Sequence, residues 1–439
     1  MNTPVVIFSI LSFFLIGLET QRTGTPLQRQ PNIILIMADD LGQEALSIYG
    51  SNSYSTPNLD ALAREGMRFN QCYSTPLCTP SRVQLMTGKY NQRNYIGFGL
   101  LDPQETTFGH LMKASEYQTC IAGKWQLLGN ARQQELAGGK IGSRPEQHGF
   151  DSYCLWQVDQ RGKRYKDPLL RIAEKGTVKF PGEYGPDIFT EYIENFMESH
   201  VDEPMFIYYP MVLTHDPFVP TPNNPEFKAF EAESKTNDPK YFGEMVHYMD
   251  QLVGRIVKKT EALGIRENTL ILFIGDNGTD RDVTSLVNGR PLRGDKGHTT
   301  TAGTQVPFIA NWPGTIRPQS VNNNLIDFTD FLPSLLEIAR TPLPSNFLTD
   351  GRSFYPQLLG KAADVREWIY CHYAPRWGKF KARDYVQNTE WKLYGNGEIY
   401  NLTQDPLENN PLSLHAVPEP VQPTLRKFNE VLLNYTLNK

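Results

Sequence analysis

The sequence is poor in cysteine and carries no excess of positive charge. Only five of its 439 residues are cysteines, and their irregular spacing argues against both a disulfide framework and a zinc site. The 43 Lys and Arg residues stand against 48 Asp and Glu, which argues against a dedicated nucleic-acid-binding protein. Glycine and proline, at 34 and 32 residues, are too few for collagen. With 39% hydrophobic and 21% charged residues, the composition is that of a globular protein and excludes a fully disordered chain.

Long apolar runs are also scarce, and the one that stands out lies near the N-terminus. Val5 to Leu18 is almost entirely apolar and is followed by polar residues. The run is short for a membrane span and suits the hydrophobic region of a signal peptide, although no Lys or Arg precedes it. We expect residues 1–20 to be a signal peptide and the protein to be exported, to the periplasm or outside the cell. A retained N-terminal anchor helix is the alternative, and no stable membrane span is expected later in the chain.

Short apolar runs alternate with helical patterns along the first three quarters of the chain. The long helical pattern covers about 241–263. The apolar runs are typical of strands buried on both faces, and they lie at 32–37, 117–122, 205–213, 269–274 and 306–310. This alternation predicts an α/β fold, in which a large, mostly parallel sheet is sandwiched by helices.

After about residue 341 the pattern changes. Four short strand-like segments follow, and the last two are separated by Gly395-Asn396-Gly397, as in an antiparallel hairpin. A final helix is predicted over about 421–437. We therefore expect a large domain over residues 21–340 and a smaller C-terminal α+β subdomain over residues 341–439, with a small antiparallel sheet and a terminal helix.

Polar residues follow four of the predicted strands: Asp39-Asp40, Lys124, His215 and Asp276-Asn277. Ligands of open parallel sheets bind at the carboxyl ends of the strands, so these side chains are expected to meet at one edge. For Asp39-Asp40 alone, a turn or helix cap explains the residues equally well. Three carboxylates and an amide oxygen together form an all-oxygen set that suits Ca²⁺ or Mg²⁺.

A second cluster is Cys78-Thr79-Pro80-Ser81-Arg82. Pro80 suits the first turn of a helix, which would place Cys78 just before a helix N-terminus, where free N–H groups attract anions. For an isolated motif of this kind, a small buried cysteine near a helix cap is the more common explanation. A thiolate is also a poor partner for a hard cation.

Taken together and in this order, the motifs resemble those of the type I sulfatases of the alkaline-phosphatase-like superfamily, over nearly the whole mature chain. The C-terminal Glu398-Ile399-Tyr400-Asn401-Leu402 and Asp405-Pro406 also resemble the end of that family. The motifs that carry the resemblance are Pro31-Asn32-Ile33, Asp39-Asp40-Leu41-Gly42, Cys78-Thr79-Pro80-Ser81-Arg82, Thr87-Gly88-Lys89-Tyr90, Gly123-Lys124-Trp125, Thr214-His215-Asp216-Pro217, Gly275-Asp276-Asn277-Gly278 and Arg293-Gly294-Asp295-Lys296-Gly297.

The resemblance implies a metal centre and a modified cysteine. In the family, the cysteine of the C-x-P-S-R motif is converted to Cα-formylglycine by a maturation enzyme, so the metal meets an oxygen and not a sulfur. Asp39, Asp40, Asp276 and Asn277 would then bind one Ca²⁺, with Mg²⁺ as the alternative. Cys78, as the hydrated formylglycine, would be both a ligand and the nucleophile that attacks the sulfur of a sulfate ester.

The resemblance also implies roles for the basic residues, and places them in a catalytic sulfatase domain over residues 21–340. Arg82 would hold the formylglycine hydroxyl. Lys124 and Lys296 would bind sulfate oxygens, and His215 would donate a proton to the leaving alkoxide.

Two stretches depart from the family pattern. Many sulfatases have a histidine after Gly-Lys-Trp, whereas this chain has Gln126, which can hydrogen-bond but cannot titrate. We expect Gln126 to line the substrate site. The stretch after Lys296 lacks the Glu-Gly and Arg that often precede Val-Pro, and His298 either compensates or is a solvated loop residue.

The sequence thus predicts a sulfuric ester hydrolase that acts on a sulfated carbohydrate. One alternative is a phosphodiester or phosphonate monoester hydrolase of the same superfamily. The other is an inactive, sulfatase-like glycan-binding protein, and Gln126 is the feature in its favour. Candidate sugar contacts, chosen because aromatic and guanidinium groups suit sulfated rings, are Trp156, Arg161, Arg164, Tyr373, Arg376 and Trp377.

Overall fold

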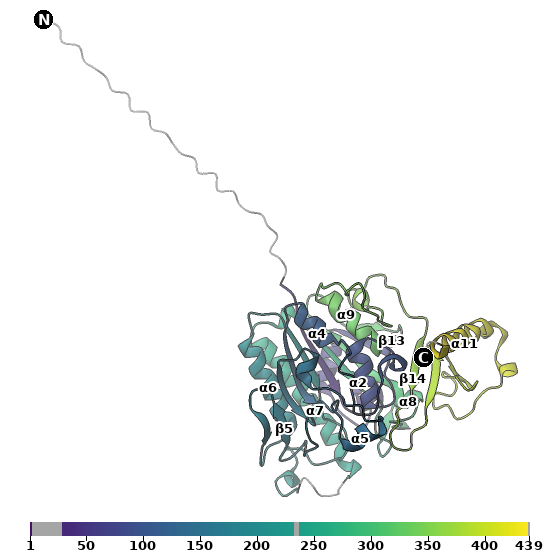
Figure 1. The fold of residues 1–439 in the computed structure, drawn as a ribbon, viewed down its shortest axis with the longest axis horizontal. Coiled ribbons are helices and arrows are strands. Elements are labelled where there is room, and N and C mark those ends of the chain that lie inside the picture. The colour runs from purple at the N-terminus through teal and green to yellow at the C-terminus, as the bar shows by residue number, and fades with distance from the viewer. Residues whose placement is uncertain (2–28, 232–236, 438–439) are drawn as a thin grey trace.

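The computed structural model describes Met1 and residues 29–231 and 237–437. The predicted signal peptide over residues 1–20 lies, apart from Met1, outside the described residues. Figure 1 shows a large body of strands flanked by helices, with a smaller lobe to one side that carries the C-terminal helix α11 (Gln422–Leu437).

The centre of the large body is a parallel sheet. Five neighbouring strands run in the same direction, in the spatial order β8 (Thr269–Gly275), β1 (Asn32–Ala38), β7 (Met205–Pro210), β3 (Gln118–Lys124) and β4 (Ser152–Trp156). Every residue of β1, β7 and β8 is buried, as the unbroken apolar runs predict. The predicted α/β class with a mostly parallel sheet is confirmed.

Strands of mixed direction extend this sheet on both sides. The run at 306–310 forms β11 (Gln305–Asn311), but it pairs antiparallel with β8 and with β2 (Met67–Tyr73). The other outer strands, which the sequence analysis does not predict, are β5 (Leu169–Ile172), β6 (Gly176–Lys179), β12 (Ser320–Asn322) and β13 (Ile326–Asp327). Within the described residues the sheet has eleven strands.

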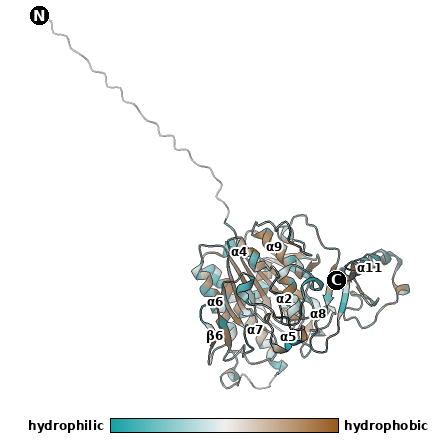
Figure 2. Cartoon of the chain, in the orientation of Figure 1, coloured by the Kyte–Doolittle hydropathy of each residue, from teal (hydrophilic) through white to brown (hydrophobic). Residues whose placement is uncertain are grey.

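Helices cover both faces of the sheet. Because side chains alternate along a strand, Ile34 and Ile36 of β1 enter one core and Ile33 and Leu35 enter the other. The first core is closed by α1 (Pro57–Arg64), α6 (Gly185–Ser199) and α7 (Phe242–Ala262). The second is closed by α2 (Cys78–Thr87), α4 (Phe108–Ala114), α9 (Phe331–Ile338) and α10 (Tyr355–Leu358). Figure 2 shows hydrophobic residues gathered around the sheet between these layers.

The lobe contains an antiparallel sheet in the order β14 (Ile369–Tyr373), β15 (Arg383–Gln387), β16 (Trp391–Tyr394) and β17 (Ile399–Asn401). Helix α11 packs on it through a shared apolar cluster, so the predicted small sheet with a terminal helix is confirmed. Phe354 and Leu358, which follow residue 341, belong to the core of the large body. A domain border at that residue stays a prediction.

The remaining α-helices and strands are short. They are α3 (Asn91–Asn94), α5 (Ala131–Leu136), α8 (Thr301–Thr304) and the hairpin of β9 (Thr284–Val287) with β10 (Arg290–Arg293). All five cysteines are described, and each is buried and free of a disulfide bond. In the part of the chain that the structure describes, no helix combines the length and the apolar character needed to cross a bilayer.

Candidate functional site

The carboxyl ends of four parallel strands deliver polar side chains to one edge of the sheet. Asp39 directly follows β1, Lys124 is the last residue of β3, and Asp276 directly follows β8. His215 lies in the segment after β7, and Lys296 follows β10. The structure brings all of these residues together, with Asp40, Cys78, Arg82, Gln126 and Asn277.

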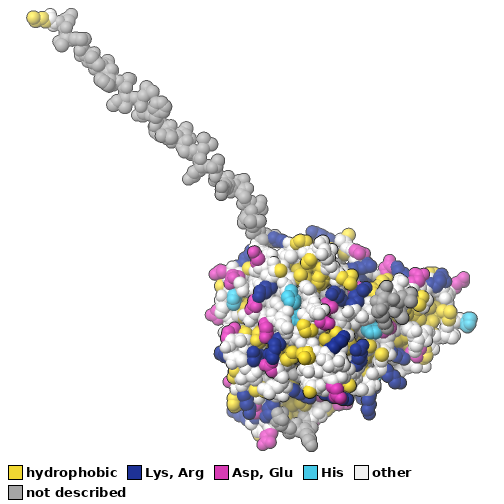
Figure 3. All heavy atoms as spheres, in the orientation of Figure 1, with side chains coloured by type: hydrophobic (Ala, Val, Ile, Leu, Met, Phe, Trp, Pro, Cys, Tyr) yellow, Lys and Arg dark blue, Asp and Glu magenta, His cyan; other side chains and the backbone are white. Residues whose placement is uncertain are grey.

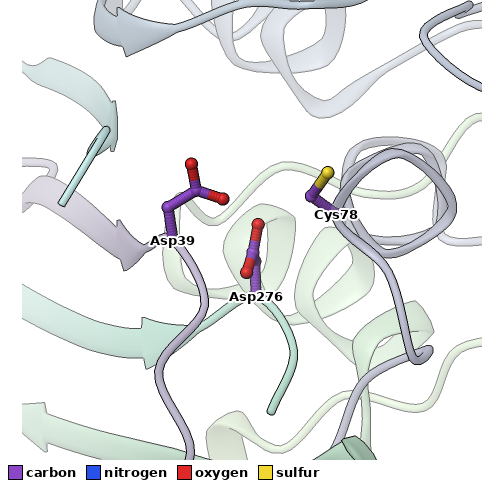
Figure 4. A group of neighbouring side chains, drawn as sticks. All are labelled: Asp39, Cys78 and Asp276. Carbon is purple, nitrogen blue, oxygen red and sulfur yellow. The ribbon is translucent and has the colours of Figure 1, made fainter. Parts of the chain in front are cut away.

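The centre of the site is a group of three buried side chains, Asp39, Cys78 and Asp276. Figure 4 shows them pointing toward one another, from the end of one strand, the start of α2 and the end of a second strand. One ligand atom from each lies within 4.8 Å of the others. Cys78 is the first residue of α2, after the N-cap Leu77, and so lies one position further into the helix than predicted.

Two buried cations balance these carboxylates. Lys124 Nζ donates to both carboxylate oxygens of Asp39, each at 2.8 Å. Arg82 donates to Asp276 Oδ2 from Nη2 at 3.0 Å and from Nε at 3.2 Å, and its Nη2 lies 3.4 Å from Asp39 Oδ1. Since charges out of water need such partners, these pairs hold both carboxylates in place.

Asp40 and Asn277 extend the cluster. The backbone N–H of Asp40 donates to Asp276 Oδ1 at 2.9 Å, and Asn277 Nδ2 donates to Asp40 Oδ1 at 2.9 Å. The other amide atom, Asn277 Oδ1, is buried and has no hydrogen-bond partner among the described residues. A buried acceptor without a partner is costly, and a carbonyl-type oxygen is a normal ligand of Ca²⁺.

Lys296 lies among three further carboxylates. Its Nζ contacts Asp40 Oδ2 and lies 3.7 Å from Asp216 Oδ1 and 4.0 Å from Asp280 Oδ2. Burial alone would lower the pKa of Lys296, but the charges of Asp40 and Asp216 outweigh it and hold the pKa well above its usual value. The ammonium therefore stays charged. It also lies 3.3 Å from His215 Nε2.

His215 is held from one side by groups that the sequence motifs do not assign to catalysis. Its Nδ1 lies 2.7 Å from Asp216 Oδ1 and 3.2 Å from Arg164 Nη2. Its Nε2 lies 3.7 Å from Asp40 Oδ2. The sequence indicates Asp216 as a partner only through its position directly after His215. Nothing in the sequence marks Arg164, which comes from a distant loop, as a partner of His215.

Cys78 is not an activated thiol. Burial raises its pKa and the charges of Asp39 and Asp276 add to this effect, which Lys124 and Arg82 offset only in part. A thiol of this kind stays neutral near pH 7. Gln126 lies beside it, with Oε1 4.0 Å from Cys78 Sγ.

The carboxylates themselves are unequally charged. Burial favours the neutral form of Asp39, but Lys124, His215 and Arg82 outweigh it and hold its pKa well below the usual range. Burial and the charge of Asp39 raise the pKa of Asp276 to about 8, although Arg82 opposes the rise. Additional positive charge would ionise Asp276 fully, and with the free Asn277 Oδ1 this donor set fits a hard divalent cation.

A cavity of about 570 Å³ opens over Cys78. Four of the six candidate sugar contacts line it, namely Trp156, Arg161, Arg164 and Trp377. The other two do not: Tyr373 is buried, donates to Gly297 O and lines an adjoining cavity, and Arg376 lines a different one. His298 lines it as well, together with residues that no motif marked, among them Phe98, Asp280, Arg281 and Phe380.

Comparison with known proteins decides the family. Residues 31–341 match the family model described as sulfatase. The chain belongs to the sulfatase family. Residues 294–432 of this sulfatase also match the model described as N-sulphoglucosamine sulphohydrolase, C-terminal.

Individual relatives agree with this assignment. Arylsulfatase A of Bos taurus is 31% identical over 90% of this chain and 82% of the relative. N-acetylgalactosamine-6-O-sulfatase of Bacteroides thetaiotaomicron is 27% identical over 89% of this chain and 91% of the relative. The predicted enzyme class, a sulfuric ester hydrolase, is confirmed.

Among solved structures, the phosphonate monoester hydrolase of Agrobacterium radiobacter superposes with a TM-score of 0.68, at 18% identity, over 93% of this chain and 96% of that one. This likeness shows the fold alone. Since a phosphonate hydrolase shares it, the fold does not by itself select sulfate over phosphonate esters.

The raised pKa of Asp276 predicts a pH effect on the stability of the metal-free protein. A carboxyl whose pKa rises from 3.8 to about 8 on folding costs stability above its unfolded pKa, and the cost grows until about pH 8. In EDTA, we expect the free energy of unfolding to fall between pH 5 and pH 8, and to fall less in Asp276→Asn. Urea titrations measure both slopes. The exposed Asp364→Asn is the control, and equal slopes for Asp276→Asn and the wild type would contradict the assignment.

Proposed function

We propose that this sulfatase removes sulfate from a sulfated carbohydrate at the cluster around Cys78. The observation that carries the proposal is the placement of Cys78, at the start of α2, within 4.8 Å of the buried carboxylates of Asp39 and Asp276. The relative that acts on N-acetylgalactosamine-6-O-sulfate supports a sugar substrate. The cavity supports an anionic one, since Lys and Arg side chains outnumber Asp and Glu along its lining.

The metal centre is the first part of the proposal. Asp39, Asp40, Asp276 and Asn277 would hold one Ca²⁺, with Mg²⁺ as the alternative, together with residue 78. The unpartnered Asn277 Oδ1 and the raised pKa of Asp276 support a cation-binding site at this point. When bound, the ion would lower the pKa of a coordinated hydroxyl and offset charge on the sulfate.

The nucleophile is the second part. The neutral, buried thiol of Cys78 is poorly suited to attack a sulfate ester. We infer that a maturation enzyme converts it to Cα-formylglycine, whose hydrate supplies an oxygen nucleophile. The place of Cys78 at the N-terminus of α2, in the C-x-P-S-R motif, supports this modification.

The remaining residues have roles that follow from their positions. Arg82 donates to Asp276 and, from Nη1 at 3.2 Å, to the backbone oxygen of Lys124, and so fixes the strand ends around residue 78. Lys124 and Lys296 keep positive charge in the cluster for sulfate oxygens. His215 lines the cavity over Cys78 and would donate a proton to the leaving oxygen. Gln126 would bind substrate or the residue-78 hydroxyl without carrying a proton.

The third part of the proposal is that the protein is exported. Export to the periplasm or the cell exterior is supported by the apolar run from Val5 to Leu18, which fits a signal peptide over residues 1–20.

The alternative activity on phosphodiesters or phosphonate monoesters has the shared fold in its favour. The rates on an aryl sulfate and on an aryl phosphodiester of the same leaving group separate the two. We expect kcat/KM to be at least about 10-fold higher for the sulfate, or about 1.4 kcal/mol in the transition state. A faster phosphodiester reaction would replace the proposal with its alternative.

Cys78→Ala tests the nucleophile. In protein from a host with the maturation machinery, we expect the rate on an aryl sulfate to fall by about 10³-fold or more, because the attacking oxygen is lost. The matched control is Cys120→Ala, a buried cysteine of β3 away from the cluster, which should keep the rate.

Mass spectrometry of the peptide that carries residue 78 completes this test. A carbonyl-reactive species should be present in the active wild type. An active protein that contains only the unmodified thiol, or a Cys78→Ala variant with a substantial rate, would contradict the mechanism. An inactive wild type that binds sulfated sugars would favour the glycan-binding alternative.

A further inference from the structure

The cavity over Cys78 is the first of three that adjoin one another. It shares Arg281, His298 and Phe380 with a second cavity of about 420 Å³. The second shares Lys381 and Arg383 with a third of about 950 Å³, which lies against the C-terminal sheet. The three adjoining cavities extend from the proposed reaction centre to the lobe, and together they are called the groove below.

The groove is positively charged, although the protein is not. The chain as a whole has a net charge of −5, and Figure 3 shows side chains of both signs interspersed over the visible face. Four acidic residues line the groove, namely Asp280, Asp295, Asp384 and Glu408. Eight basic residues line it, namely Arg161, Arg164, Arg281, Lys296, Arg376, Lys379, Lys381 and Arg383.

Most of these acidic residues are already paired within the protein. Glu408 accepts from Lys392 Nζ at 2.9 Å and from the Tyr394 hydroxyl at 2.5 Å. Asp295 Oδ1 lies 3.3 Å from Arg281 Nε. Three basic residues of the groove that have no ion-pair partner among the described residues, Arg376, Lys379 and Lys381, lie on the loop between β14 and β15. Arg161 is a fourth and lies elsewhere along the groove.

Two aromatic rings fix this loop, over residues 374–382. Trp377 stacks on Phe98 with ring centroids 4.8 Å apart. The ring of Phe380 packs so closely on Gly297 that a Cβ there would lie 2.0 Å from it. Lys379 and Lys381 flank Phe380 and are exposed, and neither has an ion-pair partner among the described residues. Ring contacts thus hold the loop at two points, and two ammonium groups without an ion-pair partner among the described residues line the groove.

We propose that Lys379 and Lys381 bind anionic units of a sulfated oligosaccharide, next to the unit whose sulfate is removed. The substrate is then a polyanionic chain of several sugars and not an isolated sulfated monosaccharide. This inference rests on the proposed function. Two ammonium groups on one loop suit sulfate or carboxylate groups along such a chain, and Phe380 lies between them in the sequence and offers an apolar face to the groove.

The test compares the binding of two probes to the Cys78→Ala protein, which is expected not to hydrolyse them. One probe is N-acetylgalactosamine 6-sulfate, and the other is a hexasaccharide in which this sugar alternates with a uronic acid. We expect the hexasaccharide to bind at least about 10-fold more tightly at low salt. The added Lys379→Ala and Lys381→Ala changes should weaken hexasaccharide binding about five-fold and monosaccharide binding less than about two-fold.

The matched control removes Lys140 and Lys361 instead, two exposed lysines outside the groove. It loses the same charge and should bind both probes as the parent does. Equal affinity for the two probes, or an equal loss for the groove and control variants, would overturn the inference. Turnover of an aryl sulfate by the wild type is measured in parallel, so that failure of the proposed function is seen separately.

Discussion

The structure depends on keeping several carboxylates buried at one edge of a parallel sheet. Asp39 and Asp276 follow neighbouring strands and lie within a few ångströms of each other out of water, where like charges repel strongly. Lys124 and Arg82 pair with them, yet the pKa of Asp276 is still raised to about 8. A further positive charge would lower the pKa of Asp276, and the unpartnered oxygen of Asn277 lies in the same cluster.

This requirement explains the placement of α2. Cys78 and Arg82 are four residues apart on that helix and so share one face, which lies against the carboxylates. Arg82 offsets part of the negative charge of the cluster, while Cys78 lies beside the carboxylates and lines the cavity. Lys296 and His215 lie next to each other in the same site, where Asp40 and Asp216 hold the ammonium in its charged form. The pairing of buried carboxylates with basic residues thus brings together the proposed nucleophile, the proposed sulfate-binding lysines and the proposed proton donor.

The sequence predicts the parts of the fold that have a simple pattern. Unbroken apolar runs located β1, β7 and β8, and the polar residues after them located the site. The sequence could not show that β11 runs antiparallel, because burial looks the same in either direction. In partly buried strands such as β5 and β6, polar and apolar residues do not alternate clearly along the sequence. Arg164 beside His215, and the loop with Phe380, come from segments without a motif, and their positions depend on packing that no local pattern encodes.

We propose that this carboxylate cluster holds a divalent cation. Elemental analysis by plasma mass spectrometry, on matured protein after dialysis against metal-free buffer, measures the bound ion. We expect about one Ca²⁺ or Mg²⁺ per chain in the wild type and less than about a tenth of that in Asp276→Ala, with sulfate ester hydrolysis lost together with the ion. A fully active wild type without bound metal would contradict it.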